Sequence, residues 1–283
     1  MTRWRRGGIE QYTSRECTDL AAHWPLGERF SVTQERIWLD PLPGFFSGLR
    51  IAQLSDIHHG LFLPKDWLAE AVQRTNRLDP DIVALTGDFV TYSKSHIEPA
   101  AEALGRLRAR YGVYAVLGNH DFRVGADDVA SALRRQRIEI LRNRHVALRF
   151  GGESLYLPGV DDYGYGADLR RAMRGIPREA ASVLLAHNPR IISSAARHGV
   201  SLVLAGHTHG GQVNLPLIGT VYGRSPERLR YKIGWDKLAT TQIYVSRGIG
   251  TIVLPWRWRC PPEITHLELL PGSKEGPRAP APN

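Results

Sequence analysis

Short apolar runs alternate with amphipathic stretches along most of the chain. The apolar runs are four to six residues long, which is typical of buried strands, and the first three occupy residues 49–54, 81–86 and 114–117. Apolar residues at helical spacing follow each run, over residues 64–78, 98–110 and 126–137. This alternation predicts an α/β fold. Upstream of it, residues 30–33 and 36–39 predict a hairpin.

The second half of the chain predicts another sheet. Two apolar stretches, 146–150 and 154–160, flank Gly151-Gly152 and are expected to pair as antiparallel strands. Later strands are predicted at residues 182–186, 201–205, 242–246 and 264–269, with a helix over residues 190–198. We therefore expect one domain over residues 29–270, an N-terminal extension over 1–28 and a disordered Pro/Gly/Ala-rich tail over 271–283.

Composition narrows the class of protein. The net charge of +9 favours anionic partners: phosphorylated metabolites, nucleic acid or an acidic membrane surface. Basic residues such as 134–137 and 170–171 lie on predicted helices, but no nucleic-acid-binding motif accompanies them. The two cysteines are too few for a disulfide framework, and no signal peptide or membrane-spanning stretch is visible. The expected location is cytoplasmic, with peripheral contact at the inner membrane face as an alternative.

Polar side chains with metal affinity follow five of the predicted strands. They are Asp56 and His58, Asp88, Asn119 and His120, His187, and His207 and His209. In an open α/β sheet the ligand site lies outside the carboxyl ends of the strands, so these residues are expected to meet. Six of the eleven histidines fall in these short segments or directly beside them, His59 included, which favours a site over a scatter of surface residues.

The chemistry of this set indicates a catalytic metal site. Aspartate, asparagine and histidine without thiolate suit Mn²⁺, Fe, Zn²⁺ or Mg²⁺. Seven ligands are too many for one ion, and a carboxylate such as Asp88 can bridge two cations about 3.5–4 Å apart. Two divalent metal ions acting on a phosphoester are therefore predicted.

The five motifs, in order, resemble those of calcineurin-like metallophosphoesterases over about residues 48–269. The resemblance implies a four-layer αββα sandwich of two mixed β-sheets flanked by helices. It also implies two metal sites with Asp88 as the bridge, one formed by Asp56, His58 and His209 and the other by Asn119, His187 and His207. By the same resemblance, His120 is no ligand but faces the substrate, and a hydroxide that bridges the metals attacks phosphorus.

The second motif departs from that of the phosphoprotein phosphatases in the family. Their motif continues with an Asp and an Arg that residues 89–93 lack, which argues against a protein phosphatase. Asp121 is then the nearest residue to orient His120, and an N-cap role in the following helix is an equal alternative.

Later segments resemble the bacterial branch that includes YkuE-like and YaeI-like phosphodiesterases. Some relatives there are assigned as UDP-2,3-diacylglucosamine pyrophosphohydrolases of lipid A synthesis. The predicted function is hydrolysis of a phosphodiester or pyrophosphate in a phosphorylated small molecule or a lipid-linked substrate. The alternative is a nucleic-acid-binding protein or nuclease-type phosphodiesterase that uses the basic surface.

Two residues and two segments are candidates for substrate contact. His59 and Arg247 are predicted to approach the substrate, Arg247 as a bidentate phosphate ligand from a glycine-flanked turn. The alternative for His59 is that it only caps the site. The alternative for Arg247 is that it is an exposed arginine without a partner. Residues 215–219 and 255–259 suit a lipid-like ligand. For the two tryptophans of the second segment, packing on one face of a strand is the favoured interpretation.

Overall fold

The computed structural model describes residues 30–60, 63, 65–215, 219–220 and 231–272. The predicted N-terminal extension lies outside these residues, as does the predicted tail apart from Pro271 and Gly272. Residues 216–218, which form most of one predicted lipid-contacting segment, also lie outside them.

The first sheet contains the first five and the last of the strands in the described residues. Its order is β1-β14-β2-β3-β4-β5. The strands are β1 (Ser31–Leu39), β2 (Leu49–Leu54), β3 (Ile82–Leu85), β4 (Val113–Ala115), β5 (Glu139–Ile140) and β14 (Glu263–Pro271). Strands β2 to β5 are parallel, whereas β14 runs antiparallel to β2 and parallel to β1.

The second sheet is built from one continuous part of the chain, in the order β12-β13-β9-β8-β7-β6. Its strands are β6 (Arg144–Phe150), β7 (Glu153–Gly159), β8 (Val183–Leu185), β9 (Leu202–Ala205), β12 (Gly234–Leu238) and β13 (Thr241–Val245). The edge strands β6 and β12 are antiparallel to their neighbours, and the four inner strands are parallel. A separate short ribbon joins β10 (Asn214–Leu215) and β11 (Gly219–Thr220).

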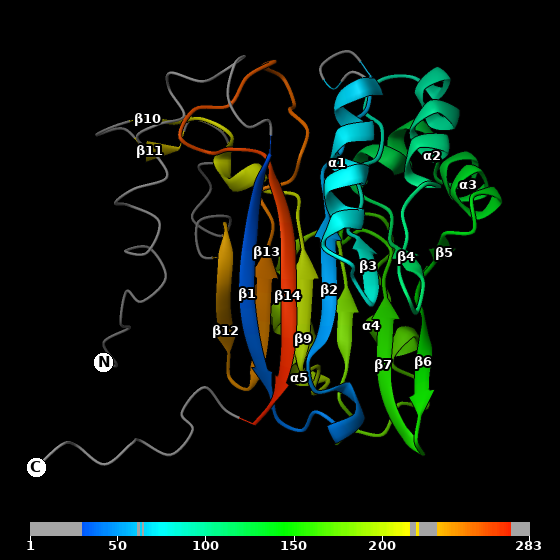
Figure 1. Ribbon diagram of the computed structural model, residues 1–283, viewed down its shortest axis with the longest axis vertical. Coiled ribbons are helices and arrows are strands. Elements are labelled where there is room, and N and C mark those ends of the chain that lie inside the picture. Colours follow the sequence, from blue (N-terminus) through cyan, green and yellow to red (C-terminus); the bar gives the residue numbers. More distant parts are fainter. Residues whose placement is uncertain (1–29, 61–62, 64, 216–218, 221–230, 273–283) are drawn as a thin grey trace, which may run out of the picture.

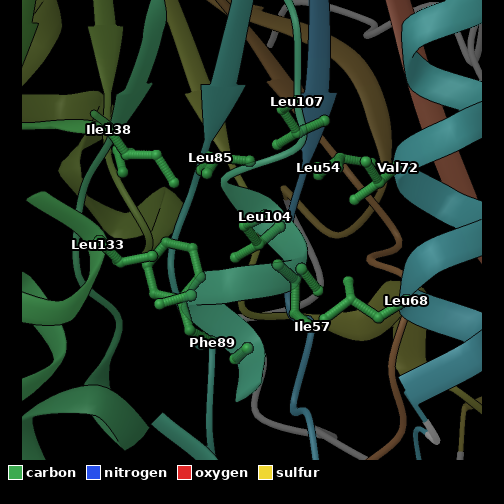
Figure 2. Close-up of a cluster of buried hydrophobic side chains, with 14 of the residues drawn as sticks. Leu54, Ile57, Leu68, Val72, Leu85, Phe89, Leu104, Leu107, Leu133 and Ile138 are labelled. Carbon is green, nitrogen blue, oxygen red and sulfur yellow. The ribbon is translucent and has the colours of Figure 1, made fainter. Parts of the chain in front are cut away.

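Helices cover the outer faces of both sheets (Figure 1). The α-helices are α1 (Lys65–Arg77), α2 (Ile97–Leu104), α3 (Asn119–Arg135), α4 (Leu169–Ala172) and α5 (Ile192–Arg197). The described residues also form four short 3-10 helices: η2 (Gly44–Phe46), η3 (Lys94–His96), η4 (Pro189–Ile191) and η5 (His209–Gly211). Figure 2 shows Leu68 and Val72 of α1, Leu104 of α2 and Leu133 of α3 in the cluster with Leu54 and Leu85 of the first sheet.

The alternation of side chains explains why the inner strands are apolar throughout. Along β2, Ala52 and Leu54 pack toward the helices, while Leu49 and Ile51 belong to the core between the two sheets. A strand that is buried on both faces needs a continuous apolar run, which is the pattern in the sequence. The predicted four-layer αββα arrangement is confirmed.

Some predicted elements differ from the observed ones. The predicted hairpin over residues 30–39 is wrong, because Ser31–Leu39 forms one strand that pairs along its whole length with β14. Helix α2 ends at Leu104, earlier than expected, and α3 begins at Asn119, directly after β4. Within the described parts of the chain, none of the helices combines the length and the apolar character needed to cross a membrane.

Candidate metal centre

The predicted ligands lie at the carboxyl ends of parallel strands from both sheets. Asp56 and His58 follow β2, Asp88 follows β3 and Asn119 begins α3 after β4, while His187 follows β8 and the pair His207 and His209 follows β9. Five of these seven have a positive φ, between 47° and 71°: Asp56, His58, Asp88, His207 and His209. A residue with a Cβ is uncommon in this region, and such strain gathers at functional sites.

Glycine makes the close approach of these strand ends possible at two positions. A Cβ on Gly206 would lie 1.8 Å from Ser55 Oγ and 2.3 Å from Asp56 Oδ2. A Cβ on Gly118 would lie 2.2 Å from Asp88 Oδ1. Neither glycine has a positive φ, so what each position requires is space.

Asp56, His58 and His209 form the first group of candidate ligands. All three are buried. His209 Nε2 lies 3.0 Å from His58 Nε2 and 3.4 Å from Asp56 Oδ1. Three ligand atoms therefore converge on one point.

Asp88, His187 and His207 form the second group. His187 Nε2 lies 3.1 Å from Asp88 Oδ2 and 3.1 Å from His207 Nδ1. The same Asp88 oxygen is 3.6 Å from His58 Nε2 in the first group. Asp88 thus lies between the two groups, where a bridging carboxylate would have to be.

The arrangement fits two divalent cations. Asn119 Oδ1 is buried and has no hydrogen-bond partner among the described residues, and a buried acceptor of this kind needs a ligand. In each group two imidazole nitrogens face each other at hydrogen-bond distance. Ligand atoms around a tetrahedral ion with bonds of about 2.1 Å are about 3.4 Å apart, close to the spacings in both groups.

Hydrogen bonds to the outer side of the ligands fix their orientation. His187 Nδ1 lies 2.8 Å from Thr86 O, and His58 Nδ1 lies 2.5 Å from Thr91 Oγ1. The Ser55 hydroxyl donates to Asp56 Oδ2 over 2.7 Å. Such contacts set the tautomer of a ligating histidine and leave its other ring nitrogen for the metal.

The electrostatics of the metal-free site differ between the two groups. Burial lowers the pKa of His58 to about 3 and that of His209 well below its usual value, so both are neutral and ready to coordinate. Burial disfavours the charged form of His187 too, but Asp88 and then Asp56 outweigh it and raise the pKa of His187 to about 10. His187 would therefore have to give up a proton to hold a cation in the second group.

His120 lies beside the groups and belongs to neither. Its side chain is half-buried, and its ring centroid is 5.0 Å from that of His58. Burial lowers the pKa of His120, which keeps the imidazole neutral near pH 7. Its backbone N–H donates to Asp88 Oδ1 over 2.8 Å, so the same residue helps to hold the carboxylate between the groups.

Asp121 acts on the backbone around the site. Its carboxylate accepts hydrogen bonds from the N–H groups of Gly118, Asp88, Phe89 and Val90 at 2.8–3.2 Å. Gly118 is the N-cap of α3 and Asp121 is its third residue, so the predicted N-cap role of Asp121 is wrong. The bond that Asp121 accepts from the Gly118 N–H is instead that of the third residue in a capping box. The other three hold the loop that carries Asp88.

His59 and Arg247, the predicted substrate contacts, are both buried. His59 Nδ1 lies 3.0 Å from Leu63 O. Arg247 pairs with Glu263 at 3.1 Å and donates to hydroxyls of Ser31 and Thr33. The guanidinium that was predicted to bind phosphate, or else to lie exposed, is thus committed to a partner inside the protein.

Arg257, which the sequence indicated only as part of the candidate lipid-contacting segment 255–259, lies beside the metal ligands. It is buried and donates to the backbone carbonyls of Gly250, Arg247 and His209, and its Nη2 lies 3.5 Å from His209 Nδ1. Its charge helps to lower the pKa of both His58 and His209. The alternation Trp-Arg-Trp indicates that Arg257 and the two tryptophans lie on opposite sides of the backbone, but it does not indicate which side is buried.

Residues 49–211 match the family model described as calcineurin-like phosphoesterase. The chain belongs to this family. The predicted family is confirmed, and the two ligand groups agree with the predicted pair of divalent metal ions.

Several relatives of known sequence extend the match beyond residue 211. The chain is 34% identical over 254 residues to the transmembrane protein with metallophosphoesterase domain of Danio rerio, covering 84% of this chain and 57% of that protein. It is 30% identical to the uncharacterized metallophosphoesterase YkuE of Bacillus subtilis, and the match covers 84% of each chain. It is 29% identical to the phosphodiesterase YaeI of Escherichia coli, and the match covers 78% of this chain and 82% of YaeI. The chain spans less than two thirds of the length of the first of these relatives. Its predicted likeness to the YkuE and YaeI branch is confirmed.

Proposed function

We propose that this protein hydrolyses a phosphodiester or pyrophosphate bond with two divalent cations. The observation that carries the proposal is the position of Asp88, whose Oδ2 is 3.1 Å from His187 Nε2 and 3.6 Å from His58 Nε2. One carboxylate therefore serves two ligand groups. Two cations side by side act on the attacking and leaving oxygens of an in-line displacement at phosphorus, which is the reaction that such a pair serves best.

The residues of the site have separate tasks in this reaction. When bound, the cations supply Lewis-acid polarisation of a phosphoryl oxygen and activation of a water molecule. The two ligand groups hold them, with Asn119 completing the second. His120 lies beside the first group, where its neutral form donates an N–H hydrogen bond that steadies a phosphoryl oxygen. Protonation of the leaving oxygen would require the ring to take up a second proton first.

The variant Asp88→Ala tests the proposal. It should abolish Mn²⁺-dependent hydrolysis of bis-p-nitrophenyl phosphate and lower the metal content measured by mass spectrometry. Asp128→Ala is a matched control, because Asp128 is an exposed residue of α3 whose carboxylate pairs only with Lys94 among the described residues. Wild-type turnover in Asp88→Ala would overturn the bridging role.

The substrate proposal is finer and needs its own measurement. A phosphorylated small molecule and a lipid-linked nucleotide such as UDP-2,3-diacylglucosamine both present the phosphorus centre that this site would attack. Assay of both with purified enzyme and Mn²⁺, Zn²⁺, Fe²⁺ or Mg²⁺ would identify the preferred substrate and metal. If only the simple diester turned over, the lipid-linked proposal would be wrong.

A further inference from the structure

The loop of residues 252–259, here called the tryptophan loop, exposes four large apolar side chains and buries an arginine between two of them. Val253, Leu254, Trp256 and Trp258 are 63%, 38%, 40% and 36% exposed, whereas Arg257 between the tryptophans is 7% exposed. The favoured interpretation of the two tryptophans, packing on one face of a strand, is therefore wrong. Burial of the cation with exposure of the indoles reverses the usual preference of these residue types.

Two polar side chains, those of Gln212 and Arg257, hold the backbone of the loop in place by hydrogen bonds. The Gln212 amide donates to the carbonyls of Ile252, Leu254 and Trp256 at 3.0–3.2 Å and accepts from the N–H of Ile252 at 2.9 Å. Arg257 satisfies further carbonyls on its inner side. Because these bonds fix the backbone, the apolar side chains are free to point outward without loss of structure.

The backbone of the loop is also held in an unfavourable conformation. Val253 has a φ of 65°, a region that a β-branched residue rarely adopts. The Gln212 bonds on both sides of Val253 maintain it. Strain of this kind persists where a function selects the conformation, and here the result is the most exposed large apolar side chain among the described residues.

The tryptophan loop is joined directly to the metal centre. Gln212 follows the ligand His209 by three residues, and Arg257 Nη1 donates to His209 O over 3.4 Å. In Figure 1 the orange connection between β13 and β14 lies at the upper end of the molecule, and η2 in blue lies at the lower end. A surface that binds through this loop would therefore lie beside the candidate active site.

The charge around the loop indicates the chemistry of its partner. Between Asp236 and Glu263 the chain contains no acidic residue, and of the arginines in this stretch Arg247 and Arg257 are buried. Arg259 is exposed at the end of the loop. Indole rings beside cations suit the interface of a membrane, and a net charge of +9 strengthens attraction to anionic lipids.

We propose that the tryptophan loop inserts Val253, Leu254, Trp256 and Trp258 into the headgroup region of an anionic membrane, with Arg259 on the lipid phosphates. The loop thereby holds the metal centre at a lipid surface. This proposal does not depend on hydrolysis, since binding uses side chains outside both ligand groups.

Flotation of the full chain with vesicles tests the proposal. Wild-type protein should bind vesicles of phosphatidylglycerol and phosphatidylethanolamine and bind phosphatidylcholine vesicles far more weakly. The double variant Trp256→Ala/Trp258→Ala should lower the partition coefficient roughly tenfold or more, because about half of the exposed apolar loop surface is removed. Its hydrolysis of a simple diester should remain at the wild-type rate.

Phe45→Ala is the matched control for the loss of an exposed aromatic ring. Phe45 is 60% exposed and lies in η2, at the other end of the molecule, so its loss should leave vesicle binding unchanged. The inactive variant Asp88→Ala should bind vesicles like the wild type, which separates this proposal from the proposed function. Absence of wild-type binding, or equal binding by the double variant, would overturn it. Self-association abolished by the tryptophan changes, without vesicle binding, would instead assign the loop to a protein interface.

Discussion

A single methyl group at Gly118 should disable the candidate metal centre by displacing Asp88. Gly118 has φ −97° and ψ 173°, an extended conformation that alanine adopts readily. Its Cβ, however, would lie 2.2 Å from Asp88 Oδ1 and 2.6 Å from the Asp88 backbone nitrogen. Carbon and oxygen in contact need more than 3 Å, so the Asp88 carboxylate has to move by about 1 Å, and the Asp88 backbone has to shift with it.

The expected loss follows from the place of Asp88 between the two groups. A displacement of about 1 Å in a catalytic group costs on the order of a hundredfold in rate, or about 2.7 kcal/mol of transition-state stabilisation. Gly118→Ala should therefore lower kcat/KM for bis-p-nitrophenyl phosphate about a hundredfold and reduce metal content. Gly44→Ala is the control, because nothing lies within 4 Å of a Cβ there. Wild-type kcat/KM and metal content in Gly118→Ala would refute the steric reasoning.

Three further changes test other parts of the site. His120→Asn should keep the wild-type metal content and lower kcat by roughly 10²- to 10⁴-fold, and metal loss measured by mass spectrometry would contradict its place outside the ligand groups. Asp121→Asn turns one hydrogen-bond acceptor into a donor that faces backbone N–H groups, so urea titration should give an unfolding free energy lower by about 1–3 kcal/mol. An unchanged unfolding free energy would contradict the role of Asp121 in holding the loop that carries Asp88. Glu263→Gln leaves the buried Arg247 without a counter-charge and should cost about 3–5 kcal/mol. Burial alone would raise the pKa of Glu263, but Arg247 lowers that pKa below its usual value. The wild type should therefore lose this stability as the pH falls from the usual glutamate range through the lowered pKa. The stability of Glu263→Gln should lack this part of the pH dependence.

The ligands could be found from the sequence because their signal is local. An apolar run that ends in Asp, Asn or His combines strand period and metal chemistry within six or seven residues, and the strand ends then meet by sheet topology alone. The assignment of His207 and His209 to separate groups came instead from the family resemblance. In the structure the two residues do lie in different groups.

What the sequence could not supply depends on distant partners. The break expected between residues 33 and 36 is absent because β1 pairs with β14, more than 200 residues away, and local propensity gives way to that pairing. The sequence around Arg247 and around Arg257 does not show whether either arginine is buried or exposed. One is buried against carbonyls and the other against Glu263, and only the packed chain distinguishes them.

The position of β14 has a consequence for synthesis of the chain. Among the described strands it is the last one made, yet it lies between β1 and β2, whereas the second sheet uses only residues 144–245. At roughly 5–20 residues per second on the ribosome, β2 waits on the order of ten seconds or more for its neighbour. The second sheet can therefore close first, while unpaired edges of the first sheet are open to chaperones or to aggregation. A premature stop ahead of Glu263 would leave every candidate metal ligand in place and still prevent the first sheet from closing.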